Sequence, residues 1–443
     1  MKRILLVLLL AINVLVYSQI PKEAFELTNS LPDLWEKENP EEAIKSSEKL
    51  NEIFQPFFID RLHHSLAQTI LRNKGKGNET VFLNELYKKD KISIKKIIEP
   101  IYLWNKSFKI NRSDKADSLL KTYYAKLSDS TNYNSKIELY GLLIVKEFED
   151  KEIGSSKLKD KILSKIVLNL SLNPLINNPA KGNRRIKEER AYYRFLLAYN
   201  YNLLFEKNKT EESIKNASKY SPDQTDLQNK SGYFYDAYLL VNDLKNINYK
   251  KKYINFLSKN GKQEIALDML LEETYIQATN ENLKNLKGFY NQIVKNKTFK
   301  TIWSNYLNSK MLEVPKIKVE FKEEILDLSK KRDSWVYIDI WGTWCAPCIK
   351  ELPEFDKVAK EYNKKLDSKI KFYSFSYNSK KLEEFMNKNN YTFPVSEINK
   401  QITQLFKVSA YPTKILISPD NKYLKIPFGV NWKEFIKNYT LID

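Results

Sequence analysis

The chain has 443 residues and a formal net charge of +19 at pH 7, and its length is sufficient for two or three domains. Of its 74 lysines and arginines only nine are arginine, the residue that most often recognises phosphates and bases. The lysines are scattered among acidic and amide residues. This distribution argues against a nucleic-acid partner, while a weak attraction to anionic membrane surfaces or acidic partners stays open.

The chain has two cysteines, Cys345 and Cys348, and so small a number excludes a framework of structural disulfides. A disulfide within one chain can only be the local Cys345–Cys348 ring, which is a redox device. A zinc site needs four ligands, and the only histidines, His63 and His64, are adjacent and far away in the sequence. Neither a metal nor another cofactor is therefore expected.

In chain order, residues 1–18 have the pattern of an export signal. Lys2 and Arg3 supply a positive start, residues 4–16 form an apolar run with one asparagine, and small residues favour a cut before Gln19. The run is shorter than the about 20 residues of a membrane span. The alternative is an uncleaved N-terminus that keeps the protein at the membrane. Either way, most of the chain is expected outside the cytoplasm, in a bacterial periplasm.

Residues 19–312 are expected to form an all-α region. Apolar residues recur there at spacings of three and four, with charged flanks, for example at 41–54 and 136–150. The stretch 191–223 resembles a tetratricopeptide-like helical hairpin, because two helical segments flank a polar turn and a proline follows. No second copy occurs at a fixed period, so a helical array and an irregular helical domain both remain open.

Breaks between helices are expected at three polar segments, 72–79, 128–134 and 173–183. The last contains two prolines and a glycine. It is therefore the best candidate for a boundary between two helical subdomains, near 173–190.

The pattern changes at residue 313, and residues 313–443 are expected to form an α/β domain. Short β-rich runs alternate there with helical ones in the order β-α-β-α-β-β-α. The expected strands are 335–341, 369–377, 413–419 and 423–428, and the expected helices are 346–366, 380–390, 399–407 and a last one from 431.

The motif WCAPC, residues 344–348, follows a hydrophobic strand and opens a helix. Cys345 would then lie at a helix N-terminus, where unpaired N–H groups and the helix dipole favour a thiolate, the species that attacks disulfides. Cys348 lies one turn later and is expected to be buried. We therefore interpret Cys345 as the nucleophile and Cys348 as the resolving thiol.

The segment 336–354, VYIDIWGTWCAPCIKELPE, resembles the active-site segment of the TlpA/ResA-type thioredoxins. Pro353, the Tyr411-Pro412-Thr413 tripeptide (411–413) and Gly429 also match the pattern of that family. The resemblance implies a thioredoxin-like fold for about the last 130 residues of the chain. It does not extend to 19–312.

The resemblance also implies a substrate site. Pro412 is expected to be cis and to pack beside the cysteines, where the backbone of Tyr411 could pair with a substrate strand. The alternative is an ordinary turn proline. Trp344 and Thr413 are the other residues expected to bind substrate.

Two acids are candidate catalytic residues. Asp339 lies six residues before Cys345, where thioredoxins keep a buried acid, and it could accept the proton of Cys348 because burial raises the pKa of a carboxyl. Glu351 lies three residues after Cys348, where ResA-like proteins carry an acid that tunes the cysteines. The alternatives are a polar residue at a strand end and an exposed helix glutamate. Residues 374–377 lack the lysine that pairs with this aspartate in thioredoxin, so the charge partner of Asp339 is left open.

The expected function is an exported thiol–disulfide oxidoreductase that acts on protein substrates, as a reductant in cell redox homeostasis, and that draws electrons from a donor in the membrane. The alternative is a partner-binding helical envelope protein whose thioredoxin-like domain serves docking or redox sensing. The proline–threonine signature that peroxiredoxins carry before their cysteine is absent, because Ile338 occupies the position seven residues before Cys345.

Overall fold

A computed structural model of the chain describes residues 20–89, 92–129, 135–177, 184–222, 239–241, 248–294, 298–365 and 368–442. Its contacts divide the chain into two units, Met1–Phe256 and Leu257–Asp443. The export signal predicted at 1–18 lies outside the described residues.

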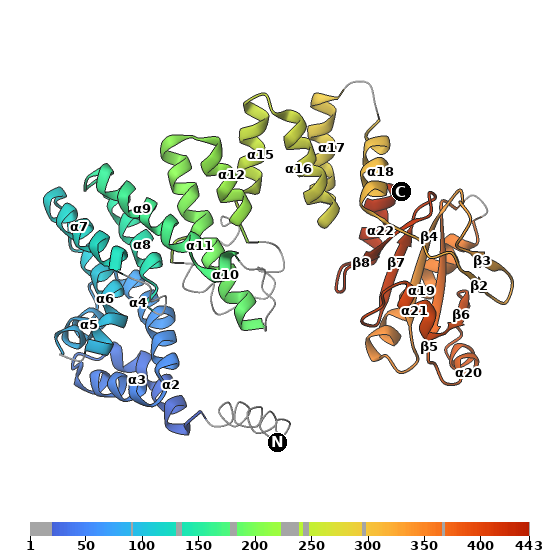
Figure 1. Cartoon of the computed structure of the whole chain (residues 1–443). Helices are drawn as coiled ribbons and strands as arrows, with labels where there is room; N and C mark the ends of the chain where they lie inside the picture. Colours follow the sequence, from blue (N-terminus) through green and yellow to red (C-terminus); the bar gives the residue numbers. More distant parts are fainter. Residues whose placement is uncertain are drawn as a thin grey trace, which may run out of the picture. The chain divides into compact units, whose positions relative to one another are not determined.

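The described part of the first unit is helical, as the spacing of its apolar residues predicts (Figure 1). Its elements are α2 (Lys22–Trp35), α3 (Glu41–Arg61), the π-helix η1 (Leu62–Leu66), α4 (Ala67–Asn73), α5 (Asn78–Lys88), α6 (Ile92–Ser107), α7 (Ser113–Asp129), α8 (Ile137–Asp150), α9 (Ser156–Ser171), α10 (Pro174–Asn177), α11 (Arg184–Asn208) and α12 (Glu211–Tyr220), followed by α15 (Lys250–Lys259), which runs into the second unit.

Helix α8 forms the centre of this unit because it is apolar around most of its circumference. Its residues from Ile137 to Val145 are all buried, and it packs against α6, α7 and α9. Tyr140 of α8 also contacts His63, whose Nδ1 lies 2.8 Å from the Tyr140 hydroxyl. The buried His63 is therefore a packing residue.

The break predicted at 72–79 agrees with the structure, whereas the described part of the break predicted at 173–183 contains the short helix α10. Helix α4 ends and α5 begins within 72–79, and α11 and α12 form the hairpin predicted at 191–223. The breaks predicted at 128–134 and 173–183 lie partly outside the described residues. Because α11 packs against α8 and α9, the helices on both sides of the break predicted at 173–183 are in contact. A subdomain boundary near 173–190 stays a prediction.

The second unit joins three helices to a mixed α/β fold (Figure 1). Its elements are α16 (Gln263–Ile276), α17 (Asn280–Ile293), α18 (Phe299–Lys310), β1 (Leu312–Glu313), β2 (Lys318–Glu320), β3 (Ile325–Asp327), β4 (Trp335–Trp341), α19 (Ala346–Asn363), β5 (Ile370–Tyr377), α20 (Leu382–Lys388), β6 (Val395–Ile398), α21 (Lys400–Leu405), β7 (Thr413–Ile417), β8 (Lys422–Ile426) and α22 (Trp432–Thr440).

The main sheet has the strand order β1-β8-β7-β4-β5-β6. Strand β4 is central: it runs parallel to β5 and antiparallel to β7. The four strands predicted from the sequence are present, and the sheet gains two edge strands that the sequence analysis missed, β1 and β6. Strands β2 and β3 form a separate two-stranded hairpin, which was also missed.

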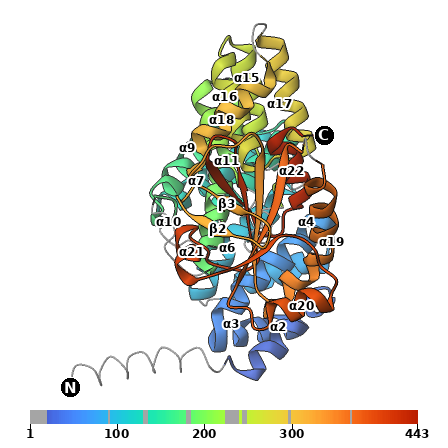
Figure 2. The ribbon, with the colours of Figure 1, turned by 90° about the vertical axis from the view of Figure 1, so that its right-hand side faces the viewer.

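Each face of the sheet has its own hydrophobic core. Successive side chains of β4 point alternately into one core and the other. Val336, Ile338 and Ile340 face the hairpin β2–β3 and α21, whereas Tyr337 and Trp341 face α19 and α22. Figure 2 shows α19 and α22 on one side of the sheet and α21 with the hairpin on the other. This alternation places odd-numbered β4 residues, Asp339 among them, on the side of the cysteines.

Helices α16, α17 and α18 extend the core on the α22 side. The indole Nε1 of Trp303 donates to the carbonyl of Asn438 at 3.2 Å, and the Asn438 side chain donates to the carbonyl of Ala278 at 2.7 Å. The hydroxyl of Tyr439 donates to the carbonyl of Tyr275. These contacts group residues 257–310 with the sheet. Helix α18 ends at Lys310 and strand β1 begins at Leu312, so the predicted boundary between 312 and 313 lies within β1 and stays a prediction as a domain boundary.

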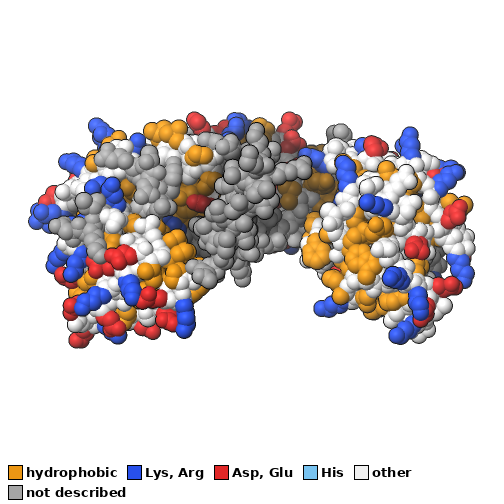
Figure 3. Space-filling model, turned by 60° about the horizontal axis from the view of Figure 1, so that its bottom comes forward, with side chains coloured by type: hydrophobic (Ala, Val, Ile, Leu, Met, Phe, Trp, Pro, Cys, Tyr) orange, Lys and Arg blue, Asp and Glu red, His pale blue; other side chains and the backbone are white. Residues whose placement is uncertain are grey.

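Within the described part of the chain, no helix is both long and apolar enough to cross a membrane. On the face drawn in Figure 3, the basic side chains of both units are interspersed with acidic ones.

Candidate active site

Strand β4 and helix α19 place the two cysteines. The strand is buried along its last six residues, and after a short loop the helix begins at Ala346 with Cys345 as its N-cap. Pro347 lies in the first turn of the helix, where the missing N–H of proline costs no hydrogen bond. The strand, turn and helix that surround WCAPC are therefore as predicted.

Cys345 and Cys348 are joined by a disulfide. The backbone N–H of Cys348 donates to Sγ of Cys345 at 3.3 Å, so the first sulfur lies at the N-terminus of α19 and caps it. Cys345 is 5% exposed and Cys348 is 1% exposed. Both cysteines are therefore buried, Cys348 the more completely, and the role of Cys345 as nucleophile stays a prediction.

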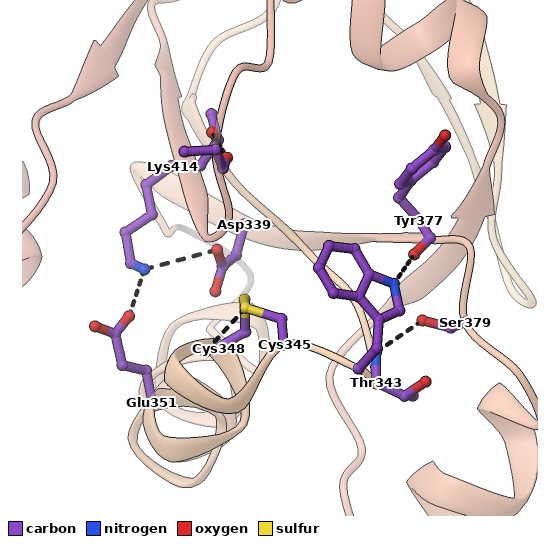
Figure 4. The surroundings of a disulfide bond; sticks show 11 residues. Asp339, Thr343, Cys345, Cys348, Glu351, Tyr377, Ser379 and Lys414 are labelled. Carbon is purple, nitrogen blue, oxygen red and sulfur yellow. Dashed lines mark hydrogen bonds and ion pairs between the residues drawn. A yellow bond between two sulfur atoms is a disulfide. The ribbon is translucent and has the colours of Figure 1, made fainter. Parts of the chain in front are cut away.

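The loop before the disulfide is held by backbone contacts. The N–H of Thr343 donates to the hydroxyl of Ser379 at 3.0 Å, and the indole of Trp344 donates to the carbonyl of Tyr377 at 3.1 Å (Figure 4). A Cβ on Gly342 would come within 2.8 Å of that same carbonyl and within 2.5 Å of the Trp344 indole. The motif therefore requires glycine at 342.

Trp344 and Tyr411 form an aromatic surface beside the disulfide. The indole is half exposed and meets the Tyr411 ring edge-on at 5.1 Å, and Tyr411 in turn stacks on Tyr377 at 5.8 Å. The Tyr411–Pro412 peptide bond is cis, as predicted. The hydroxyl of Thr413 donates to the carbonyl of Ala410 at 2.6 Å, which closes the turn around the proline.

Asp339 is almost completely buried, and its carboxylate points toward the disulfide (Figure 4). Burial raises the pKa of this carboxyl from its ordinary value to about 6, because a charged group loses its hydration there. The ammonium of Lys414 opposes the rise in pKa, and the carboxylate of Glu351 adds to it.

Lys414 supplies the charge partner that the sequence analysis left open. It lies directly opposite Asp339 in the antiparallel pair β4–β7, and its Nζ is 3.7 Å from Oδ1 of Asp339. The same Nζ donates a hydrogen bond to Oε2 of Glu351. A signal was present in the sequence, since Lys414 is the one charged residue in the β7 segment TKILI.

The site thus combines a dithiol pair, a buried acid of raised pKa and an aromatic surface beside a cis-proline. This combination is suited to attack by one thiolate, release by the second thiol and transfer of its proton to a nearby base. Among the described residues, no group of three or more His, Cys, Asp or Glu side chains could hold a metal ion.

Comparison with known proteins relates the second unit to a family. The model of the AhpC/TSA family matches residues 312–424. The thiol-disulfide oxidoreductase ResA of Bacillus subtilis is 29% identical over 117 residues, which are 26% of this chain and 64% of ResA. The thioredoxin-like protein YneN of the same species is 30% identical over 123 residues, which are 28% of this chain and 71% of YneN. The chain belongs to the thioredoxin-like proteins.

Membership of the thioredoxin-like family confirms the resemblance inferred from WGTWCAPC. The matched segment contains both cysteines, Asp339, Glu351 and Pro412. The chain spans somewhat less than two thirds of ResA, and about a quarter of the chain takes part in that match. The family assignment therefore concerns the C-terminal unit.

Solved structures of thioredoxin-like proteins also show similarity to a part of the chain. A lipoprotein thioredoxin of Streptococcus pneumoniae is 19% identical and covers 28% of this chain and 98% of its own, with a TM-score of 0.25. The thioredoxin domain of a thiol-disulfide oxidoreductase of Bacteroides vulgatus is 17% identical and covers 29% of this chain and 95% of its own, with a TM-score of 0.26.

Proposed function

We propose that the chain is an exported thiol–disulfide oxidoreductase that exchanges the Cys345–Cys348 pair with cysteines of protein substrates. The observation that carries the proposal is the position of Cys345 at the N-cap of α19, where its sulfur accepts the N–H of the buried Cys348. A helix N-terminus stabilises a thiolate, and a second thiol within reach can release a mixed disulfide.

The reaction runs in two steps when the pair acts as a reductant. The thiolate of Cys345 attacks a substrate disulfide, one substrate sulfur leaves as a thiolate, and Cys345 is left in a mixed disulfide. Cys348 then gives its proton to Asp339 and attacks Sγ of Cys345. The second substrate sulfur leaves, the Cys345–Cys348 bond forms, and two electrons have passed to the substrate.

Substrate recognition is assigned to the surface around the cis-proline. Trp344 presents half of its indole to solvent, and Tyr411 packs against it. An extended substrate segment would pair with the backbone at Tyr411 and lie against Trp344 and Thr413, because added strands gain affinity through backbone hydrogen bonds.

The proposal also includes export of the chain and a direction of electron flow from the dithiol to the substrate. Residues 1–18, with Lys2, Arg3 and an apolar run, support transport to a periplasm, where a membrane donor would supply electrons. A reductant role follows from the resemblance to ResA-type proteins. An equilibrium potential of the pair near or below about −270 mV, the range of thioredoxin, would fit it, and a much higher potential would indicate an oxidant.

Trapping of mixed disulfides tests the assigned order of the cysteines. In cells, Cys348→Ala should accumulate mixed disulfides that survive on a non-reducing gel, because Cys345 attacks and no thiol resolves. Cys345→Ala should trap little, since the remaining sulfur is buried. Mass spectrometry of the trapped species would name the substrates.

Two outcomes contradict the proposal in different ways. Equal trapping by both variants would overturn the order of attack. If neither variant traps a partner and the native pair is never found oxidised, the thioredoxin-like unit would instead serve docking or sensing in a partner-binding helical protein.

A further inference from the structure

Lys414 occupies a position where an unpaired cation would be costly. Its side chain is 10% exposed, and it lies two residues after Pro412 as the one charged residue of strand β7. Removing an ammonium from water costs several kcal/mol unless it is paired and hydrogen-bonded, so the surroundings must supply anions.

Two carboxylates share this one ammonium, and they differ in their access to solvent. Nζ of Lys414 donates a hydrogen bond to Glu351, whose side chain is 44% exposed, and lies 3.7 Å from Asp339, whose side chain is 2% exposed. Figure 4 shows the Lys414 amine between the two acids. Oδ1 of Asp339 makes no hydrogen bond to any of the described residues.

The other groups that face Asp339 carry no full charge. Tyr337 precedes it by two residues on the same face of β4, and Ser374 lies opposite it in β5, where the hydroxyl accepts the indole N–H of Trp341. Helix α19 contributes Cys348 together with Glu351. The charges that act on Asp339 are therefore those of Lys414 and Glu351, in agreement with the causes of its raised pKa.

We propose that Lys414 is a positioning residue for which Asp339 and Glu351 compete, and that Glu351, by binding the ammonium, leaves Asp339 able to accept the proton of Cys348. This inference rests on the proposed exchange reaction and deepens it. Loss of Glu351 and loss of Lys414 should therefore have opposite effects on the charge that stabilises the Asp339 carboxylate. Loss of Glu351 lets the ammonium turn to Asp339, whereas loss of Lys414 leaves Asp339 without a cation.

The arrangement also balances charge during resolution. When Cys348 gives its proton to Asp339, the carboxylate becomes neutral and Cys348 becomes the attacking thiolate. If Asp339 were the sole partner of Lys414, this step would leave a buried ammonium unpaired. Glu351 remains as its partner, so the proton transfer does not carry that penalty.

The test follows the two thiol steps separately in the full-length reduced chain. The aromatic disulfide DTNB releases one thionitrobenzoate when Cys345 attacks it and a second when Cys348 resolves the mixed disulfide. At high DTNB concentration the first release is complete before the second. The pH dependence of the second release then reports the base that serves Cys348.

Single substitutions should move this pH dependence in opposite directions. Glu351→Gln should lower the midpoint pH of the second release by about one unit, because the ammonium then stabilises the Asp339 carboxylate. Lys414→Met should raise the midpoint by about one unit, because the buried carboxylate then lacks a cation. In a Lys414→Met background, Glu351→Gln should have a much smaller effect.

A matched ion pair on the same helix provides the control. Glu354 on α19 and Lys433 on α22 lie 2.5 Å apart, and both are about half exposed. Glu354→Gln and Lys433→Met should leave the midpoint unchanged, since surface ion pairs act weakly on distant groups.

The inference is overturned if both substitutions shift the midpoint in the same direction, or if neither shifts it. It is also overturned if Glu351→Gln acts equally with and without Lys414, because Glu351 would then act without the lysine. Glu351 is exposed, so its variant should fold even if Lys414→Met does not. Failure of the native chain to release any thionitrobenzoate would instead contradict the proposed function.

Discussion

Asp339 is a carboxyl group that the fold buries at an energetic cost. Its pKa in the folded chain is about 6, above the ordinary value of 3.8, so the folded state binds this proton more tightly than the unfolded state does. The free energy of unfolding therefore falls as pH rises through the interval between about 4 and 6, and it stays lower at neutral pH. Such a cost is expected where an acid serves chemistry.

Asp339→Asn should remove this cost. Above pH 7 the variant should be more stable than the native chain by about 2 to 3 kcal/mol, and the difference should vanish below pH 4. Urea unfolding between pH 4 and 8, followed by tryptophan fluorescence, measures both limits. The exposed Asp333 offers a control, because Asp333→Asn should leave the pH dependence unchanged. A variant that is less stable than the native chain at pH 8 would show that Asp339 stabilises the fold.

At the scale of elements, α18 belongs to the same core as the sheet. Trp303 on α18 is completely buried, and its ring lies 5.9 Å from that of Tyr439 on α22. The core that contains Trp303 continues through Tyr337 to Cys348. Packing of the helices α16–α18 is therefore expected to contribute to the stability of the active-site unit.

A pair of tryptophan substitutions tests this expectation. Trp303→Ala should destabilise the second unit by about 3 to 5 kcal/mol, because it leaves a cavity and an unpaired carbonyl at Asn438. Trp344→Ala, on the half-exposed indole beside the disulfide, should change stability by less than about 1 kcal/mol while it weakens substrate reduction. Thermal unfolding and reduction of insulin compare the two variants. Equal losses of stability would contradict the separation of roles.

At the scale of the whole molecule, all the thiol chemistry lies in the second unit, since both cysteines lie there. The first unit is a packed set of helices of more than 200 residues. Selection of partners by this unit stays a prediction, and both cysteines of the exchange reaction lie outside it.

A truncated chain tests the division of roles. Residues 260–443, which keep α16–α18 on the sheet, should fold and react with DTNB at a rate close to that of the full chain. With Cys348→Ala, the fragment should trap a different set of partners from the full chain with the same substitution. A fragment of residues 313–443 is the control, and it should be less stable because the apolar side of α22 loses its cover. Identical sets of trapped partners would exclude selection by the helices.

The sequence by itself determined what depends on neighbouring residues. The position of Cys345 at a helix N-terminus follows from a strand and a helix within a few residues of WCAPC. The cis peptide before Pro412 was expected from the resemblance of residues 411–413 to the TlpA/ResA-type thioredoxins. The helical character of the described residues between 20 and 310 follows from periodicity, because one face of each helix must be buried.

Only the tertiary structure decided which distant residues meet. Lys414 lies 75 positions after Asp339, and the two become partners only through the register of β4 and β7. Strand β6 was missed because it is short and its residues do not alternate between buried and exposed. The packing of α16–α18 on α22 was likewise not predicted. An apolar helix face shows that it will be buried but not against which element, so the partner is fixed by the packing of the whole unit.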